Sequence, residues 1–164
     1  MTFLRPAQHF FRALQFTSTL LVLSLAGALL HQNRHGGTPT RINYSIYAAV
    51  FAMFSLCYLL TAHFFQRIHH PAISIPLDLL NAIFMGCAAV AMSASMGGKS
   101  CADRNFLDSS GICQGSGKRC SEANAMTAFE WIAMIGFVGA LLIGLEGWRR
   151  ERGMQKLSRG RGAV

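Results

Sequence analysis

Residues 125–145 read AMTAFEWIAMIGFVGALLIGL and carry a single formal charge, at Glu130. A helix rises about 1.5 Å per residue, and roughly 20 residues therefore cross the hydrocarbon core of a bilayer, which is about 30 Å thick. Backbone amides surrounded by lipid must be hydrogen-bonded within their own segment, which a helix achieves. The stretch therefore predicts a transmembrane helix.

Three further apolar stretches of similar length, residues 13–30, 44–65 and 73–96, precede it, and Asp78 is the one formal charge among them. The 164-residue chain is 52% hydrophobic and 13% charged, and soluble domains carry about twice that charged fraction. We therefore predict an all-α fold, a four-helix transmembrane bundle in one domain (residues 1–148), followed by a polybasic tail (residues 149–164).

The N-terminal segment allows more than one interpretation. Arg5 and Arg12, an apolar run and the small residues 26–28 also fit a cleavable signal peptide. However, Phe10 and Phe11 make the region before the run unusually apolar, and we expect a retained helix. The helical spacing of apolar and polar residues here predicts either a short amphipathic helix in the interface or an extension of the first span.

The distribution of Lys and Arg indicates the orientation of the chain. Four spans place both termini on one side, and nine of the 15 Lys and Arg residues lie on that side. Cytoplasmic segments of membrane proteins are enriched in Lys and Arg. We therefore expect both termini in the cytoplasm, in the plasma membrane or the secretory pathway.

Three of the five cysteines, Cys101, Cys113 and Cys120, lie in the loop between the third and fourth spans. In the expected orientation this loop faces away from the cytoplasm, where disulfides persist. A bridge from Cys101 to Cys120 would join the end of the third helix to the start of the fourth. A Cys113–Cys120 bridge is the alternative, and three reduced thiols are a further one. We predict a disulfide-bearing loop, with the first pairing favoured.

Small residues mark faces on which helices can approach closely. Because lipid gives helices no hydrophobic gain on association, close packing and polar contacts must hold them together. We expect helix packing through small residues that recur every four positions in the third and fourth spans: Ala82, Gly86, Gly136, Ala140 and Gly144. These positions serve either packing within the bundle or self-association.

Polar residues inside the predicted spans, Asp78, Asn81 and Glu130, are candidate functional residues. Asp78 and Glu130 each lie five residues into helices that start on opposite sides of the membrane. This spacing predicts about 15 Å between them along the membrane normal, too far for a carboxylate pair. We expect Arg12 or Arg149, near the same leaflet, to be the partner of Asp78.

The segment after the last span is strongly basic, and its glycines indicate disorder. Anionic lipid attracts such a segment by about 1 kcal/mol per charge. We expect lipids of the inner leaflet to contact its six basic residues: Arg149, Arg150, Arg152, Lys156, Arg159 and Arg161.

The chain carries no pattern that indicates catalysis. A nucleophile elbow, a phosphate-binding loop and a dinucleotide fingerprint are absent. The histidine pairs, His31 with His35 and His69 with His70, lack a neighbouring cysteine or acid that would complete a metal site. We expect no enzyme activity, cofactor, metal or nucleic-acid partner, since membrane topology accounts for the net charge of +8.

Three motifs occur in order, each at one of the predicted spans: RINYSIY (residues 41–47), PLDLLNAIF (76–84) and RCSEANAMTAFEW (119–131). With the four-span plan they resemble fungal MARVEL-domain membrane proteins, the group that includes the non-classical export proteins, over residues 8–148. The resemblance implies a role in organising membrane microdomains or in vesicle trafficking, without catalytic residues. It also supports the Cys101–Cys120 pairing, since family members have cysteines near both positions, whereas Cys113 departs from their pattern.

We therefore expect a non-enzymatic integral membrane protein that associates laterally with membrane lipids and proteins, as a homo-oligomer or with a partner membrane protein. The alternative is an accessory subunit of a larger membrane enzyme or channel. A small transporter is less favoured, because it needs a polar track through the bundle and the polar residues of the predicted spans cluster near their ends.

Overall fold

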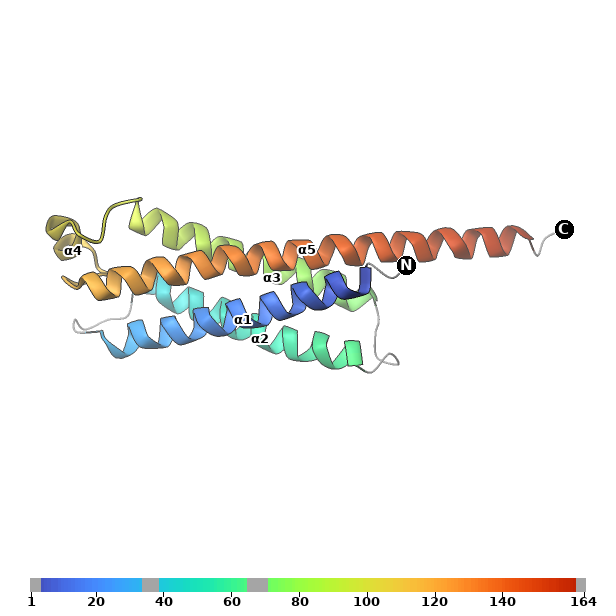
Figure 1. Ribbon diagram of the computed structural model, residues 1–164, viewed down its shortest axis with the longest axis horizontal. Coiled ribbons are helices and arrows are strands. Elements are labelled where there is room, and N and C mark those ends of the chain that lie inside the picture. Colours follow the sequence, from blue (N-terminus) through green and yellow to red (C-terminus); the bar gives the residue numbers. More distant parts are fainter. Residues whose placement is uncertain (1–3, 34–38, 65–70, 162–164) are drawn as a thin grey trace.

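The computed structural model of the protein describes residues 4–33, 39–64 and 71–161. It describes the backbone but not the side chains of residues 4–5, 63–64, 71–72, 151 and 154–161. These residues are almost entirely helical (Figure 1). The helices are α1 (Leu4–His31), α2 (Thr40–Phe64), α3 (Pro71–Met96), α4 (Arg104–Ser109) and α5 (Gly117–Arg161).

The four long helices form one bundle. α1 packs against α2 and α5, and α3 packs against the same two helices, which closes a ring of four. Both ends of the chain lie at one end of this bundle, which we call the tail end (Figure 1). α4 lies at the opposite end, which we call the loop end. α5 continues past the other helices at the tail end.

Four helices are long and apolar enough to cross a membrane, which confirms the predicted four-helix transmembrane bundle. The candidate spans are Pro6–His31, Thr40–Ala62, Ile73–Met96 and Gly117–Arg150. Residue 65, the last of the second predicted span, lies outside the described residues. The fourth predicted span, residues 125–145, lies within the longer helix α5, which begins at Gly117 and ends at Arg161.

The expectation that the tail, residues 149–164, is disordered was wrong as far as Arg161. No proline interrupts the sequence after Leu145, and Arg150 donates to the Glu146 carboxylate one turn earlier at 2.8 Å. Pairs of this spacing support a helix beyond its apolar part. The tail is therefore a helical extension of the fourth span as far as Arg161.

The N-terminal segment and the first span form one continuous helix, α1. This agrees with the interpretation of the segment as an extension of the first span. Its polar face points inward: Phe10 is 64% exposed and Arg12 is 5% exposed. A helix in water buries its apolar stripe, but a helix surrounded by lipid tolerates apolar side chains outside and places polar ones against its neighbours.

The loop end is closed by an ordered connection between α3 and α5. Gly97 and Gly98 follow α3 with φ of +57° and +67°, the left-handed conformation in which glycine commonly ends a helix. A disulfide joins Cys101 to Cys120 across a Cα–Cα distance of 5.7 Å. The predicted disulfide-bearing loop is thus confirmed. Cys113 is buried and free, so the alternative pairing is not adopted.

Candidate functional sites: the polar interior and the loop-end cavity

A buried ion pair connects α1 to α3 near the tail end. Arg12 donates from Nη1 and Nη2 to the two carboxylate oxygens of Asp78, at 2.5 and 2.7 Å. Asp78 is 2% exposed, so both charges are shielded from the surroundings. Of the two partners expected for Asp78, the structure has Arg12.

The same guanidinium group begins a chain of hydrogen bonds that reaches a third helix. Arg12 donates to Oε1 of Gln15 at 3.0 Å. Gln15, which is completely buried, donates from Nε2 to the backbone carbonyl of Gly136 on α5 at 2.9 Å. The polar groups therefore link α3, α1 and α5 inside the bundle.

Glu130 lies in a separate part of this interior. It is completely buried on α5, and the side chain of Ser45 from α2 lies beside its carboxyl group. Neither carboxyl oxygen has a hydrogen bond from the residues that the structure describes. Glu130 had been expected near the membrane interface, five residues into its span; α5 begins earlier, at Gly117, so the residue lies further along its helix than expected. Asp78 and Glu130 have different neighbours and form no carboxylate pair, as expected.

Asn81 follows Asp78 by less than one turn of α3 and is also completely buried. Its amide donates to the carbonyl of Leu77 on the same helix at 2.9 Å. This bond satisfies the amide nitrogen but does not cross-link two helices. Among the described residues, no group of three His, Cys, Asp or Glu side chains is arranged to hold a metal ion.

The small residues proposed for helix packing lie at interfaces inside the bundle. A Cβ atom added at Gly136 would lie 3.1 Å from Cγ of Gln15, and one added at Gly86 would lie 3.1 Å from the sulfur of Met134. Ala82 and Ala140 are buried, and a Cβ at Gly144 would meet Ile75 at 3.6 Å. These positions therefore contribute to internal packing.

Arg119 is a buried structural residue that our sequence reasoning counted only as a surface charge. It is 2% exposed. Its Nε donates to the carbonyl of Ile112 at 3.1 Å, and its Nη1 donates to the carbonyl of Leu29 near the C-terminus of α1 at 2.9 Å. Carbonyls at helix C-termini lack intrahelical donors, so Arg119 caps α1 and fixes the loop to it. The sequence offered one signal for this role: Arg119 directly precedes Cys120, which was expected to form a disulfide.

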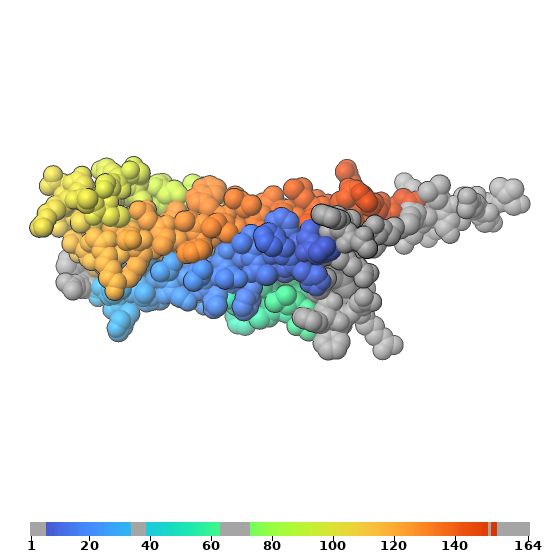
Figure 2. All heavy atoms as spheres, in the orientation of Figure 1, coloured from blue at the N-terminus to red at the C-terminus, as the bar shows by residue number. Residues whose placement is uncertain are grey.

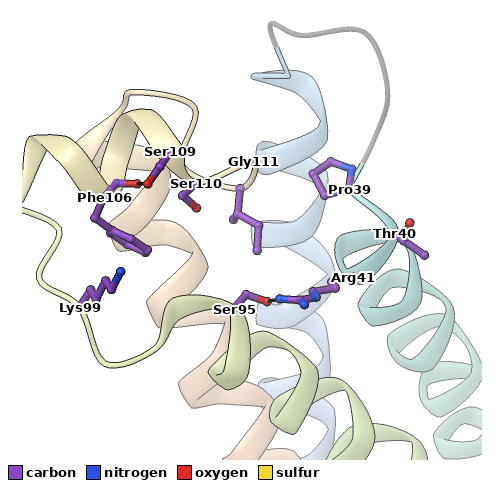
Figure 3. Close-up of a pocket in the computed structure, with 10 residues that line it drawn as sticks. Pro39, Thr40, Arg41, Ser95, Lys99, Phe106, Ser109, Ser110 and Gly111 are labelled. Atoms are coloured by element: carbon purple, nitrogen blue, oxygen red, sulfur yellow. Dashed lines mark hydrogen bonds between the residues drawn. The ribbon is translucent and has the colours of Figure 1, made fainter.

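A cavity of about 450 Å³ opens at the loop end, where the start of α2, the end of α3 and the α4 region meet (Figure 3). We call it the loop-end cavity. Its polar lining includes two cations and three hydroxyl groups: Arg41, Lys99, Ser95, Ser109 and Ser110. No motif of the sequence had singled out this set, because its members come from four segments of the chain.

The basic residues after the last span begin where the bundle ends. Arg149 and Arg150 are exposed, and the Arg152 guanidinium lies 3.7 Å from the centroid of the Trp148 ring. The side chains of Lys156, Arg159 and Arg161 lie outside the described residues. Figure 2 shows the described part of α5 at this end, next to the start of α1.

Comparison with known proteins places the chain in a family. The MARVEL model, described as a membrane-associating domain, matches residues 3–143. The chain is 30% identical to "Non-classical export protein 2" of Saccharomyces cerevisiae, over 84% of this chain and 79% of that protein. It is 33% identical to "Non-classical export protein 102" of Candida albicans, over 80% and 77% of the two chains. No solved structure matches the chain.

The family match spans the four apolar helices and the disulfide-bearing loop described above. It confirms the resemblance drawn from the three sequence motifs. The chain therefore belongs to the MARVEL family and is an integral, multi-pass membrane protein.

Proposed function

We propose that this protein organises membrane microdomains or takes part in vesicle trafficking, through lateral association with lipids and proteins and without catalysis. The observation that carries the proposal is the MARVEL match across all four spans. The names of the yeast relatives, which refer to non-classical export, agree with a role in trafficking.

The distribution of side chains supports lateral association through the outer surface. Each spanning helix presents large apolar residues outward, including Phe54, which is 74% exposed, and Leu142, which is 60% exposed. Gly136 and Gly144 face side chains of neighbouring helices inside the bundle, Gln15 and Ile75. Lipids and neighbouring proteins therefore meet the apolar outer surface, and self-association through Gly136 is not part of the proposal.

The basic extension of α5 supports contact with the cytoplasmic leaflet, which is rich in anionic lipid. A tryptophan followed by arginines is typical of the interface between membrane and water. We therefore place both termini in the cytoplasm. Arg149, Arg150 and Arg152 lie at the start of the contact, and the basic residues further along α5 extend it.

Chemical cross-linking in native membranes, followed by mass spectrometry, tests the main proposal. Capture of copies of this chain, together with other multi-pass proteins at variable ratios, is the expected result. Capture of one unrelated membrane protein at a fixed ratio would instead identify an accessory subunit. A Leu142→Ala variant and a matched Phe54→Ala variant alter the apolar surface of two different helices, α5 and α2, and show which helix carries the contact.

A fluorophore at the C-terminus of the full-length protein tests the tail. In vesicles that contain quencher-labelled anionic lipid, the fluorescence should be strongly quenched at low salt and less so at high salt, because salt screens exposed charges. Substitution of Arg149, Arg150 and Arg152 by Gln should reduce the quenching. Substitution of Arg104 and Lys118, at the loop end, should leave it unchanged. Equal quenching in all three proteins contradicts the tail contact.

A further inference from the structure

The loop-end cavity has the charge of an anion-binding site. Arg41 and Lys99 line it, and none of its ten lining residues is acidic. Arg41 donates from Nη1 to the Ser95 hydroxyl, which uses one of the five donors of a guanidinium group. The Lys99 ammonium lies 5.4 Å from the centroid of the Phe106 ring, a cation–π distance. These contacts hold both cations in place without neutralising them.

The cationic and hydroxyl side chains are arranged around one cavity. Figure 3 shows Arg41 and Lys99 on opposite sides of the cavity, with Ser109 and Ser110 along a third side. Thr40, the first residue of the 25-residue helix α2, also lines the cavity. The N-terminus of a helix carries a partial positive charge. A phosphate group has enough oxygen acceptors for two cations and neighbouring hydroxyls.

The cavity lies where two candidate spans end, which is where lipid headgroups are expected. The candidate span on α2 begins at Thr40 and that on α3 ends at Met96, and the cavity is built around these two ends. A shallow, open apolar groove of about 430 Å³ follows one face of α3 from Ala82 to Ala91. Ala91 lies one turn before Ser95, whose hydroxyl donates to the Ala91 carbonyl at 2.7 Å. A polar cavity is thus followed along one helix by an apolar groove inside the membrane.

We propose that the loop-end cavity binds the anionic phosphate headgroup of a membrane lipid, between Arg41 and Lys99, with an acyl chain along the α3 groove. The lipid belongs to the leaflet opposite the two termini. The inference deepens the lipid association in the proposed function and names the site for it. A soluble phosphate lacks an acyl chain and would leave the groove unused.

Native mass spectrometry of the purified full-length protein in detergent tests this inference, with phosphatidic acid as the probe and phosphatidylcholine as the comparison. The Arg41→Gln/Lys99→Gln variant should retain about tenfold less phosphatidic acid than the unmodified protein, because two charge-assisted contacts are lost. The matched control is Arg104→Gln/Lys118→Gln, which removes the same charge from exposed residues of the loop end outside the cavity. This control should retain the lipid.

Two further measurements identify the source of the phosphate. Ala91→Trp fills the junction between the cavity and the groove and should lower the retention of phosphatidic acid. Inorganic phosphate at millimolar concentration should not displace the lipid. Displacement by inorganic phosphate would assign the cavity to a soluble anion, and equal losses in the control and cavity variants would show unspecific charge attraction; either result overturns the inference.

Circular dichroism shows whether each variant is folded. Should the double variant not fold, Lys99→Gln alone replaces it, since it preserves the Arg41–Ser95 hydrogen bond. Loss of lipid retention in the cavity variants is then the expected result, and full retention contradicts the site. The cross-linking experiment reports protein neighbours and does not depend on this lipid, so failure here leaves the proposed function standing.

Discussion

An Asp78→Asn variant should lose about 3–5 kcal/mol of unfolding free energy. Asparagine keeps the size of the side chain but removes the charge that faces Arg12. The guanidinium group, which is 5% exposed, then keeps its bond to Gln15 at 3.0 Å and at most one bond to the asparagine Oδ1. One of the two bonds at 2.5 and 2.7 Å is lost, and the buried cation has no counter-charge.

The magnitude follows from comparing two effects. Interhelical hydrogen bonds in membranes contribute on average about 0.6 kcal/mol and at most about 1.7 kcal/mol. Even the loss of both bonds between Arg12 and Asp78 would therefore account for only about 1–3 kcal/mol. An unpaired charge in an apolar environment costs more, about 3–5 kcal/mol. Against a typical total stability of about 5–15 kcal/mol, the charge is the larger effect and should remove roughly a fifth or more of the stability.

Unfolding of the purified protein by increasing mole fractions of SDS, followed by far-ultraviolet circular dichroism, measures this loss. The double variant Arg12→Met/Asp78→Leu should recover most of the stability, because an apolar pair of similar volume leaves no buried charge. Leu142→Ala is the control. It shortens a side chain that is 60% exposed on the outer surface and should change stability by less than about 0.5 kcal/mol.

One outcome would refute the reasoning. Suppose that the unfolding free energy of Asp78→Asn lies within about 1 kcal/mol of that of the unmodified protein, and that the double variant is less stable. The Arg12 guanidinium would then be solvated by groups other than Asp78. The pair would then lie at the membrane interface, in reach of water or headgroups, and the bundle interior would end before Arg12.

Three further predictions follow from the same interior and from the loop end. Glu130→Gln should keep or raise the stability in the SDS assay, because neither carboxyl oxygen has a hydrogen bond from the described residues and the amide avoids burying a charge. Gly136→Ala should cost about 1–3 kcal/mol by crowding a hydrogen-bonded side chain, whereas Gly27→Ala, which meets nothing within 4 Å, should be neutral or stabilising by up to about 1 kcal/mol. Maleimide labelling of the SDS-denatured protein should modify three thiols before reduction and five after it, and labelling of Cys101 or Cys120 before reduction would contradict the bridge.

The four spans and the disulfide-bearing loop could be predicted from the sequence because the bilayer constrains length and polarity in a simple way. A run of about 20 apolar residues has one stable conformation in lipid. The bounds of the fourth helix could not be obtained by this reasoning. Hydropathy marks the apolar part of a helix, and the polar turns from Gly117 to Asn124 and after Leu145 are helical for local reasons, such as the Arg119 contacts and the Arg150–Glu146 pair.

The polar interior was only partly predictable. Asp78 and Glu130 stand out as charges inside apolar runs, but the depth of Glu130 depends on where its helix begins. The burial of Arg12 and Gln15 had a usable signal. These residues and Thr19 have the spacing i, i+3 and i+7, which places them on one helical face, and Val22 and Ala26 continue that face into the core. Hydropathy averaged over a span does not detect such a polar stripe.

The inward position of the polar groups also limits where this protein can discriminate among lipids. Apolar side chains such as Phe54 and Leu142 cover the outside of the spans, and acyl chains offer them dispersion contacts with little chemical selectivity. Headgroups differ in charge and hydrogen bonding, so selectivity must come from the two ends of the bundle. The tail end presents exposed arginines, which recognise anionic surfaces in general. The loop end presents two cations fixed by Ser95 and Phe106 around a cavity, an arrangement that can select one headgroup.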